Sequence, residues 1–154
     1  MSENYNYFYD EYYQDMAKLV EMYKTIPNPH VVSIYRGSLP MGVHLSNALK
    51  CPMSIVKYQS RDGEDTKAEW LLNLTHDKTL RPHARFFPHL IVVDDIYDTG
   101  KTFRAVLDLF EFEKNPMYSC IALFGNENDD KVNYLHEQLY RWIVFPWERV
   151  KGGM

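Results

Sequence analysis

Apolar residues in this chain recur at two spacings, one typical of helices and the other of buried strands. Residues 10–25 follow the helical i, i+3, i+4, i+7 spacing and Pro27 ends the pattern, so we expect a helix there. Its apolar positions are Met16, Leu19, Val20 and Tyr23. By contrast, residues 90–93 form an unbroken apolar run, which predicts a strand buried on both faces.

The same patterns divide most of the remaining chain into alternating elements. The expected strands cover residues 31–35, 53–58, 118–124 and 142–145, the expected helices cover 40–49, 101–112 and 132–139, and a hairpin is expected over 68–74. Strands that alternate with crossover helices predict an α/β fold with a mainly parallel sheet flanked by helices. Ligands of such sheets bind at the carboxyl ends of the strands.

Length and composition are those of one globular domain. The chain has 154 residues, of which 45% are hydrophobic and 25% are charged. We therefore treat residues 1–154 as a single domain, with an aromatic N-terminal helix in 1–29 and a flexible polar loop at 59–83. The formal net charge of −4 argues against a nucleic-acid partner. The chain lacks an apolar run of the ~18 residues that a membrane span needs, and its start lacks a signal-peptide pattern. We therefore expect no membrane contact and a cytoplasmic location.

Tyrosine and cysteine add two expectations about packing. Six of the twelve tyrosines precede residue 24, and we expect their rings to pack against the core while their hydroxyls reach water. Part of that aromatic surface is expected to lie across a subunit contact. Cys51 and Cys120 fit no metal or disulfide spacing, and we expect two buried thiols.

The segment from residue 90 to residue 102 carries the most informative chemistry. An apolar strand delivers Asp94 and Asp95 to its end, a tight loop follows, and a helix begins near Lys101. Free backbone N–H groups and the helix dipole collect anions at such a start, and Gly100 allows a close approach of the backbone. Carboxylates beside a phosphate repel it unless they bind hydroxyl groups or a cation. The segment therefore predicts a sugar phosphate as ligand, with Mg²⁺ offsetting the charge.

Three other interpretations of this segment explain less. A Walker A phosphate loop needs a glycine five residues before Gly100, where this chain has Asp95. Capping of the helix accounts for one carboxylate, such as Asp98, but not for three at one place. A phospho-receiver module would collect its acids from separate strands and add a lysine on the last one, whereas here the acids share one loop.

The segment resembles the binding motif for phosphoribosyl pyrophosphate (PRPP) in type I phosphoribosyltransferases. That motif is an apolar strand, two acids, two residues and then Asp-Thr-Gly-x-Thr, and residues 90–102 match it throughout. Residues 35–42 resemble the pyrophosphate loop of the family, and residues 142–148 resemble the base-binding segment of bacterial xanthine-guanine and hypoxanthine phosphoribosyltransferases. The resemblance spans roughly residues 30–150 in the order of the family.

The resemblance implies roles for individual residues. The PRPP-binding positions are Asp94, Asp95, Asp98, Thr99, Gly100, Lys101 and Thr102. Asp98 would be the catalytic general base or proton relay near N7 of a purine. Asp95 and Glu148 would take part in binding Mg²⁺. Arg36 and Gly37 would bind pyrophosphate.

The resemblance also implies a base-binding hood within residues 125–154. Trp142 would stack on the purine and main-chain groups of Ile143 would read its edge. Asn126 stands where 6-oxopurine enzymes carry a lysine that reads O6, and its amide can donate to O6 without bringing a charge. The loop at 59–83 would close as a lid over the reacting centre, with Arg61 or Lys67 meeting pyrophosphate.

The expected function is that of a purine salvage enzyme. It would transfer the phosphoribosyl group of PRPP to hypoxanthine, or to guanine or xanthine, and release pyrophosphate as a nucleoside monophosphate forms. Members of the family commonly form homodimers or homotetramers, and we expect one of these. The alternative is a catalytically weak member that binds PRPP or a nucleotide as a regulator.

Overall fold

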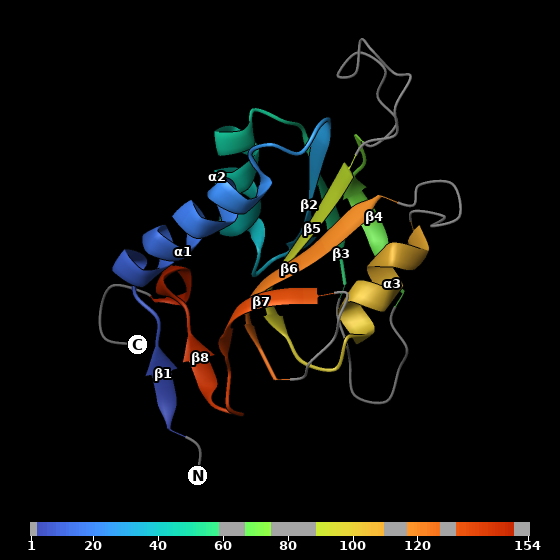
Figure 1. Ribbon diagram of the computed structural model, residues 1–154. Coiled ribbons are helices and arrows are strands. Elements are labelled where there is room, and N and C mark those ends of the chain that lie inside the picture. The colour runs from blue at the N-terminus through green and yellow to red at the C-terminus, as the bar shows by residue number, and fades with distance from the viewer. Residues whose placement is uncertain (1–2, 59–66, 75–88, 110–116, 127–131, 150–154) are drawn as a thin grey trace.

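The computed structural model describes residues 3–58, 67–74, 89–109, 117–126 and 132–149 (Figure 1). A six-stranded sheet runs through these residues in the order β4-β3-β2-β5-β6-β7. The strands are β2 (Pro29–Tyr35), β3 (Met53–Lys57), β4 (Glu69–Leu72), β5 (His89–Tyr97), β6 (Tyr118–Gly125) and β7 (Val132–Glu137). Neighbouring strands pair in parallel except β3 and β4, which pair antiparallel. The predicted α/β fold is confirmed. Of the hairpin expected over 68–74, the structure has one strand, β4, which pairs with β3 and not with a second strand inside that stretch.

Helices cover both faces of this sheet. Helices α1 (Tyr9–Tyr23) and α2 (Leu39–Leu49) lie on one face, and α3 (Lys101–Leu109) lies on the other (Figure 1). Strand β5 supplies apolar side chains to both layers: Ile91 and Val93 join the cluster under α1 and α2, while Leu90 and Val92 join the cluster under α3. This alternation is the reason for the unbroken apolar run in the sequence.

A small second sheet stands apart from the main one. Strand β1 (Asn4–Asn6) pairs in parallel with β8 (Trp142–Val144), and a 3-10 helix, η3 (Pro146–Glu148), follows. The expected strand at 142–145 is therefore present but belongs to this separate sheet. Its partner β1 is too short and too polar to give a strand signal in the sequence.

The helix expected over residues 132–139 is wrong, because Val132–Glu137 form strand β7. Val132 and Leu135 stand three residues apart and fit a helical period, but the free edge of β6 offers a full ladder of parallel partners. Gly125 on β6 leaves room for the ring of Tyr134, which a Cβ at that position would strike. Trp142 therefore follows a strand and a turn rather than a helix.

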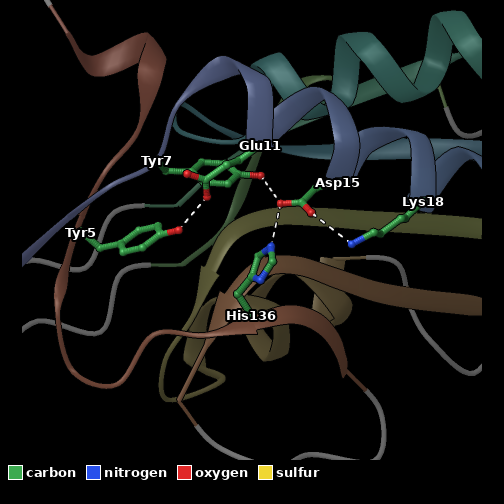
Figure 2. A network of polar contacts seen from close by, with 6 residues as sticks. All are labelled: Tyr5, Tyr7, Glu11, Asp15, Lys18 and His136. Carbon is green, nitrogen blue, oxygen red and sulfur yellow. Dashed lines mark hydrogen bonds and ion pairs between the residues drawn. The ribbon is translucent and has the colours of Figure 1, made fainter.

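A buried carboxylate joins three segments on the α1 side of the sheet (Figure 2). Asp15 of α1 accepts a hydrogen bond from the hydroxyl of Tyr7, in the segment before the helix. The same oxygen lies 2.7 Å from Nε2 of His136 on β7. Lys18 contacts the other oxygen at 3.8 Å, while Tyr5 donates to Glu11 at 2.6 Å. This network fixes β7 against α1 and the N-terminal segment.

The expected burial of N-terminal tyrosine rings is confirmed, but the hydroxyl of Tyr7 donates to the buried Asp15 and does not reach water. Tyr7, Tyr12 and Tyr23 are buried in the core, whereas Tyr9 and Tyr13 are exposed. Cys120 is buried and Cys51 is partly buried, both as free thiols. Among the helices that the structure describes, none is long and apolar enough to cross a membrane.

Two expectations fall partly outside the described residues. Of the proposed lid at 59–83, only residues 67–74 are described. The helix expected over 101–112 is confirmed as far as Leu109, and residues 110–112 lie outside.

Candidate active site

The carboxyl ends of four neighbouring parallel strands lie along the same end of the sheet. Strand β2 ends at Tyr35, β3 at Lys57, β5 at Tyr97 and β6 at Gly125. Parallel pairing places the residues that follow each of them on the same side of the molecule. The predicted site residues after β2, β5 and β6 therefore come from neighbouring strand ends.

Asp94 and Asp95 lie within β5, one on each side of the strand. The backbone N–H of Asp95 donates to Oδ1 of Asp94 at 2.9 Å, and that of Ile96 donates to Oδ1 of Asp95 at 2.8 Å. Burial raises the pKa of Asp94 well above its usual range, and the neighbouring charge of Asp95 raises it further. Burial also raises the pKa of Asp95. A cation or hydroxyl donors would stabilise the charged forms of both.

The loop after β5 lines the first cavity of the site. Asp94 and the stretch from Ile96 to Phe103 line a cavity of about 310 Å³, together with Tyr58. Gly100 adopts a left-handed backbone with φ of 82°, which glycine tolerates best, and α3 begins at the next residue. The N–H of Lys101 contacts Oγ1 of Thr99 at 3.5 Å. The loop therefore holds the N-terminus of a helix and two hydroxyl groups at one cavity, as an anion site requires.

The loop after β2 forms the second cavity. Its volume is about 680 Å³, and its lining residues are Tyr35, Arg36, Gly37, Tyr58, Trp147 and Glu148. The peptide bond between Tyr35 and Arg36 is cis. A Cβ on Gly37 would collide with the carboxylate of Asp95, so the β2 loop and β5 approach as closely as backbone and carboxylate allow.

Glu148 reaches this cavity from the C-terminal hood. Burial raises the pKa of its carboxyl; the charge of Asp95 raises it further and that of Arg36 opposes the rise. The charges of Asp95 and Arg36 thus both act on Glu148, although the three residues come from separate parts of the chain.

Tyr58 is a site residue that the sequence analysis did not single out. It follows β3 directly and lines both cavities. The rule that ligands bind at the ends of parallel strands points to it, because β3 ends beside β2. Lys67 lies across a third cavity of about 520 Å³ that Tyr58, Lys101 and Arg104 also line, while Arg61 lies outside the described residues.

Two of the expected base-binding residues, Trp142 and Ile143, lie away from these two cavities. Trp142 is 66% exposed, and Ile143 is buried opposite Tyr5 in the small sheet. Neither lines the two cavities described above. Their roles toward a base stay predictions.

Asn126 is held by hydrogen bonds to other protein groups. Its Nδ2 donates to Oδ1 of Asp98 at 3.2 Å and to Oε1 of Gln138 at 2.6 Å. Its Oδ1 accepts from the backbone N–H of Tyr140 at 3.2 Å. Both amide hydrogens are therefore directed at protein acceptors, which differs from the free donor that the sequence led us to expect.

Comparison with known proteins adds the family. The model of the phosphoribosyl transferase domain matches residues 9–148. No curated protein matches this chain. Three solved structures share the fold at low sequence identity, and each likeness speaks for the fold alone.

The first is a purine phosphoribosyltransferase from Pyrococcus horikoshii, 20% identical, with a TM-score of 0.74 over 96% of this chain and 95% of that one. The second is a xanthine-guanine-hypoxanthine phosphoribosyltransferase from Helicobacter pylori, 21% identical, with a TM-score of 0.72 over 96% and 94%. The third is a hypothetical protein from Neisseria gonorrhoeae with bound ppGpp, 18% identical, with a TM-score of 0.67 over 98% and 92%. Because the domain model covers nearly the whole chain and the folds agree, this chain belongs to the phosphoribosyltransferase family of the type I class.

Proposed function

We propose that this chain transfers the phosphoribosyl group of PRPP to a 6-oxopurine, with hypoxanthine as the first candidate and guanine and xanthine next. The products are a nucleoside monophosphate and pyrophosphate. The observation that carries the proposal is the meeting of two loops at one sheet edge. The Arg36-Gly37 loop after β2 approaches the carboxylate of Asp95, and its cavity shares Tyr58 with the cavity of the loop after β5.

In this proposal, each loop holds one end of PRPP. The N–H groups and hydroxyls from Thr99 to Thr102 bind the 5′-phosphate at the start of α3. Asp94 and Asp95 accept hydrogen bonds from the ribose hydroxyls. Arg36 and the backbone at Gly37 bind the pyrophosphate. Together they orient C1 of the ribose toward the base, and such positioning is a large part of catalysis.

The carboxylates fit a Mg²⁺ ion that arrives with PRPP. The described residues include no group of three or more metal-ligating side chains that could hold an ion alone. Mg²⁺ usually binds to one or two carboxylates plus phosphate oxygens of the substrate, and Asp95 and Glu148 would supply these carboxylates. Their raised pKa values fit carboxylates placed where a cation would stabilise their charge. When bound, the ion neutralises charge on the pyrophosphate leaving group.

Asp98 is the proposed general base. It lines the same cavity as residues Thr99 to Thr102. In this proposal it takes a proton from the purine as N9 attacks C1 of the ribose. Trp142 is the proposed shelf for the purine ring, and main-chain groups of Ile143 are the proposed readers of its edge. Closure of the proposed lid at 59–83 would exclude water, which would otherwise hydrolyse PRPP.

The choice of a purine has support from two structural neighbours. They are named as a purine and as a xanthine-guanine-hypoxanthine phosphoribosyltransferase. The C-terminal segment 142–148, which resembles the base-binding segment of such enzymes, supports the same choice.

A second candidate function is the binding of a nucleotide as a regulatory signal. The neighbour from Neisseria gonorrhoeae is named with bound ppGpp, a guanine nucleotide that carries two pyrophosphate groups. A crevice that holds a phosphate at one end and a pyrophosphate at the other has the chemistry for such a ligand as well.

Pyrophosphate release separates the two candidates. The assay supplies PRPP and Mg²⁺ with hypoxanthine, guanine, xanthine or adenine. We expect release with a 6-oxopurine, and a loss of about 10²- to 10⁴-fold in kcat for Asp98→Asn, with a much smaller loss of affinity for PRPP. Asp10→Asn, an exposed site on α1, is the control. PRPP binding without turnover of any base would favour the regulator, and an unchanged kcat in Asp98→Asn would remove that residue from catalysis.

A further inference from the structure

We infer that Asn126 is a positioning residue that fixes Asp98 relative to the turn leading into the base-binding segment, and that it does not itself read the base. The inference rests on the proposed function, because it gives Asn126 a role through the general base. It concerns the residue that replaces the lysine of the 6-oxopurine enzymes.

The side chain of Asn126 donates both of its amide hydrogens to groups within the protein. One Nδ2 hydrogen is donated to Oδ1 of Asp98 and the other to Oε1 of Gln138. An asparagine amide has two hydrogens to donate, and both are engaged. The bond to Asp98 ends on Oδ1, so it does not occupy Oδ2, the oxygen that we propose takes a proton from a bound purine.

The backbone of Asn126 is held as firmly as its side chain. Its N–H donates to the carbonyl of Tyr97 at 3.2 Å, directly before Asp98. Asn126 is therefore bonded both to the end of β5 and to the catalytic carboxylate that follows. Because the backbone of Asn126 is anchored next to Asp98, its side-chain bond to Oδ1 restricts the rotamers that this exposed carboxylate would otherwise explore.

The side chain of Asn126 also forms hydrogen bonds to Gln138 and Tyr140 in the turn that joins β7 to β8. The N–H of Gln138 donates to the carbonyl of Gly125 at 2.8 Å, and its Nε2 donates to the carbonyl of Arg141 at 2.9 Å. Tyr140 donates its N–H to Oδ1 of Asn126, although its backbone is left-handed with φ of 56°. Strand β8 begins two residues later, at Trp142. The side-chain amide of Asn126 thus connects Asp98, the proposed general base, to the turn that precedes Trp142, the proposed shelf for the purine.

This arrangement distinguishes Asn126 from a residue that reads the purine. A lysine at this position could extend past Asp98 and carry a charge to O6. The shorter amide meets Asp98 and Gln138 instead, and a purine oxygen would have to displace one of these acceptors.

The test is a double-mutant cycle between Asn126 and Asp98. Asn126→Ala alone should lower kcat about tenfold, with the KM for PRPP unchanged, because a hydrogen bond to a charged group is lost. In the Asp98→Asn background, Asn126→Ala should lower kcat no further, because it acts through the carboxylate. Losses that multiply in the double variant would overturn the inference, as would a single variant that changes only the KM for the base. Asn47→Ala, at an exposed site on α2, is the matched control.

A second measurement does not depend on turnover. The side-chain NH₂ resonances of Asn126, assigned by their absence in Asn126→Ala, should move in Asp98→Ala and in Gln138→Leu. Resonances that stay in place would overturn the inference even if the enzyme is active. If the wild-type chain turns over no base but these resonances move, the proposed function fails while the contact from Asn126 to Asp98 stands.

Discussion

At the scale of single residues, the site depends on the absence of a side chain at Gly37. The loop after β2 passes so close to β5 that a Cβ there would strike the Asp95 carboxylate. Its neighbour Arg36 lines the larger cavity, and Asp95 is the residue proposed to meet both ribose and Mg²⁺. Any side chain at Gly37 must therefore displace a carboxylate that the proposed reaction uses.

Gly37→Ala tests this close approach. The methyl group should push the Asp95 carboxylate aside and weaken PRPP binding at least tenfold, which equals about 1.4 kcal/mol. Calorimetric titration with PRPP and Mg²⁺ measures this affinity. The melting temperature shows whether the fold survives. A folded variant with the affinity of the wild type would mean that Asp95 and the β2 loop need not lie together.

The lining of the smaller cavity could be predicted where its residues are contiguous in the sequence. Asp94 to Thr102 form one strand, one loop and one helix start, so their shared chemistry is visible in a single run of letters. Tyr58 and Gln138 were not predicted as site residues, because each follows a different strand, far from residues 94–102 in the sequence. Their contributions depend on strand order and register, which local patterns do not specify.

At the scale of elements, the local sequence pattern predicts the wrong structure for β7, which is a strand and not a helix. Its apolar spacing fits a helix, and only the unpaired edge of β6 makes it a strand. His136 then reaches Asp15 of α1, 121 residues earlier in the chain. Long-range partners of this kind override local propensity, and a periodicity analysis does not include them.

Asp15→Asn tests the network that joins α1 to β7. The substitution keeps the shape of the side chain but removes the charge that Tyr7 and His136 contact. Because hydrogen bonds to a buried charged group are lost, the free energy of unfolding should fall by about 2 kcal/mol. Urea denaturation measures it. Asp10→Asn, on the exposed side of α1, should change it by less than about 0.5 kcal/mol. Equal effects of the two variants would mean that the network adds no stability.

At the scale of the whole molecule, two apolar layers enclose the sheet, and the N-terminal tyrosines close the layer under α1 and α2. Tyr7, Tyr12 and Tyr23 belong to that layer. Burial raises the pKa of all three phenols, and for Tyr7 the hydrogen bond to Asp15 raises it further. The folded chain therefore holds these protons more tightly than the unfolded chain does.

This difference predicts a loss of stability at alkaline pH. The stabilisation is fully present below 10.0, the ordinary pKa of tyrosine, and is lost as the pH rises above it. Each buried tyrosine should cost about 1 kcal/mol at about one pH unit above that value. Urea midpoints at about pH 8 and about pH 11 measure the loss. Tyr7→Phe should reduce it, whereas Tyr13→Phe, at an exposed position, should not. An equal alkaline loss in both variants would contradict this explanation.

Every role proposed for a residue of this molecule requires that the crevice at the carboxyl ends of β2 and β5 binds PRPP. Titration calorimetry with PRPP in the presence of Mg²⁺ tests it most directly. The wild-type chain and Asp10→Asn should bind with the same affinity, and Asp95→Asn should bind at least tenfold more weakly. A wild-type chain that does not bind PRPP, or an Asp95→Asn variant that binds it equally well, would contradict the claim.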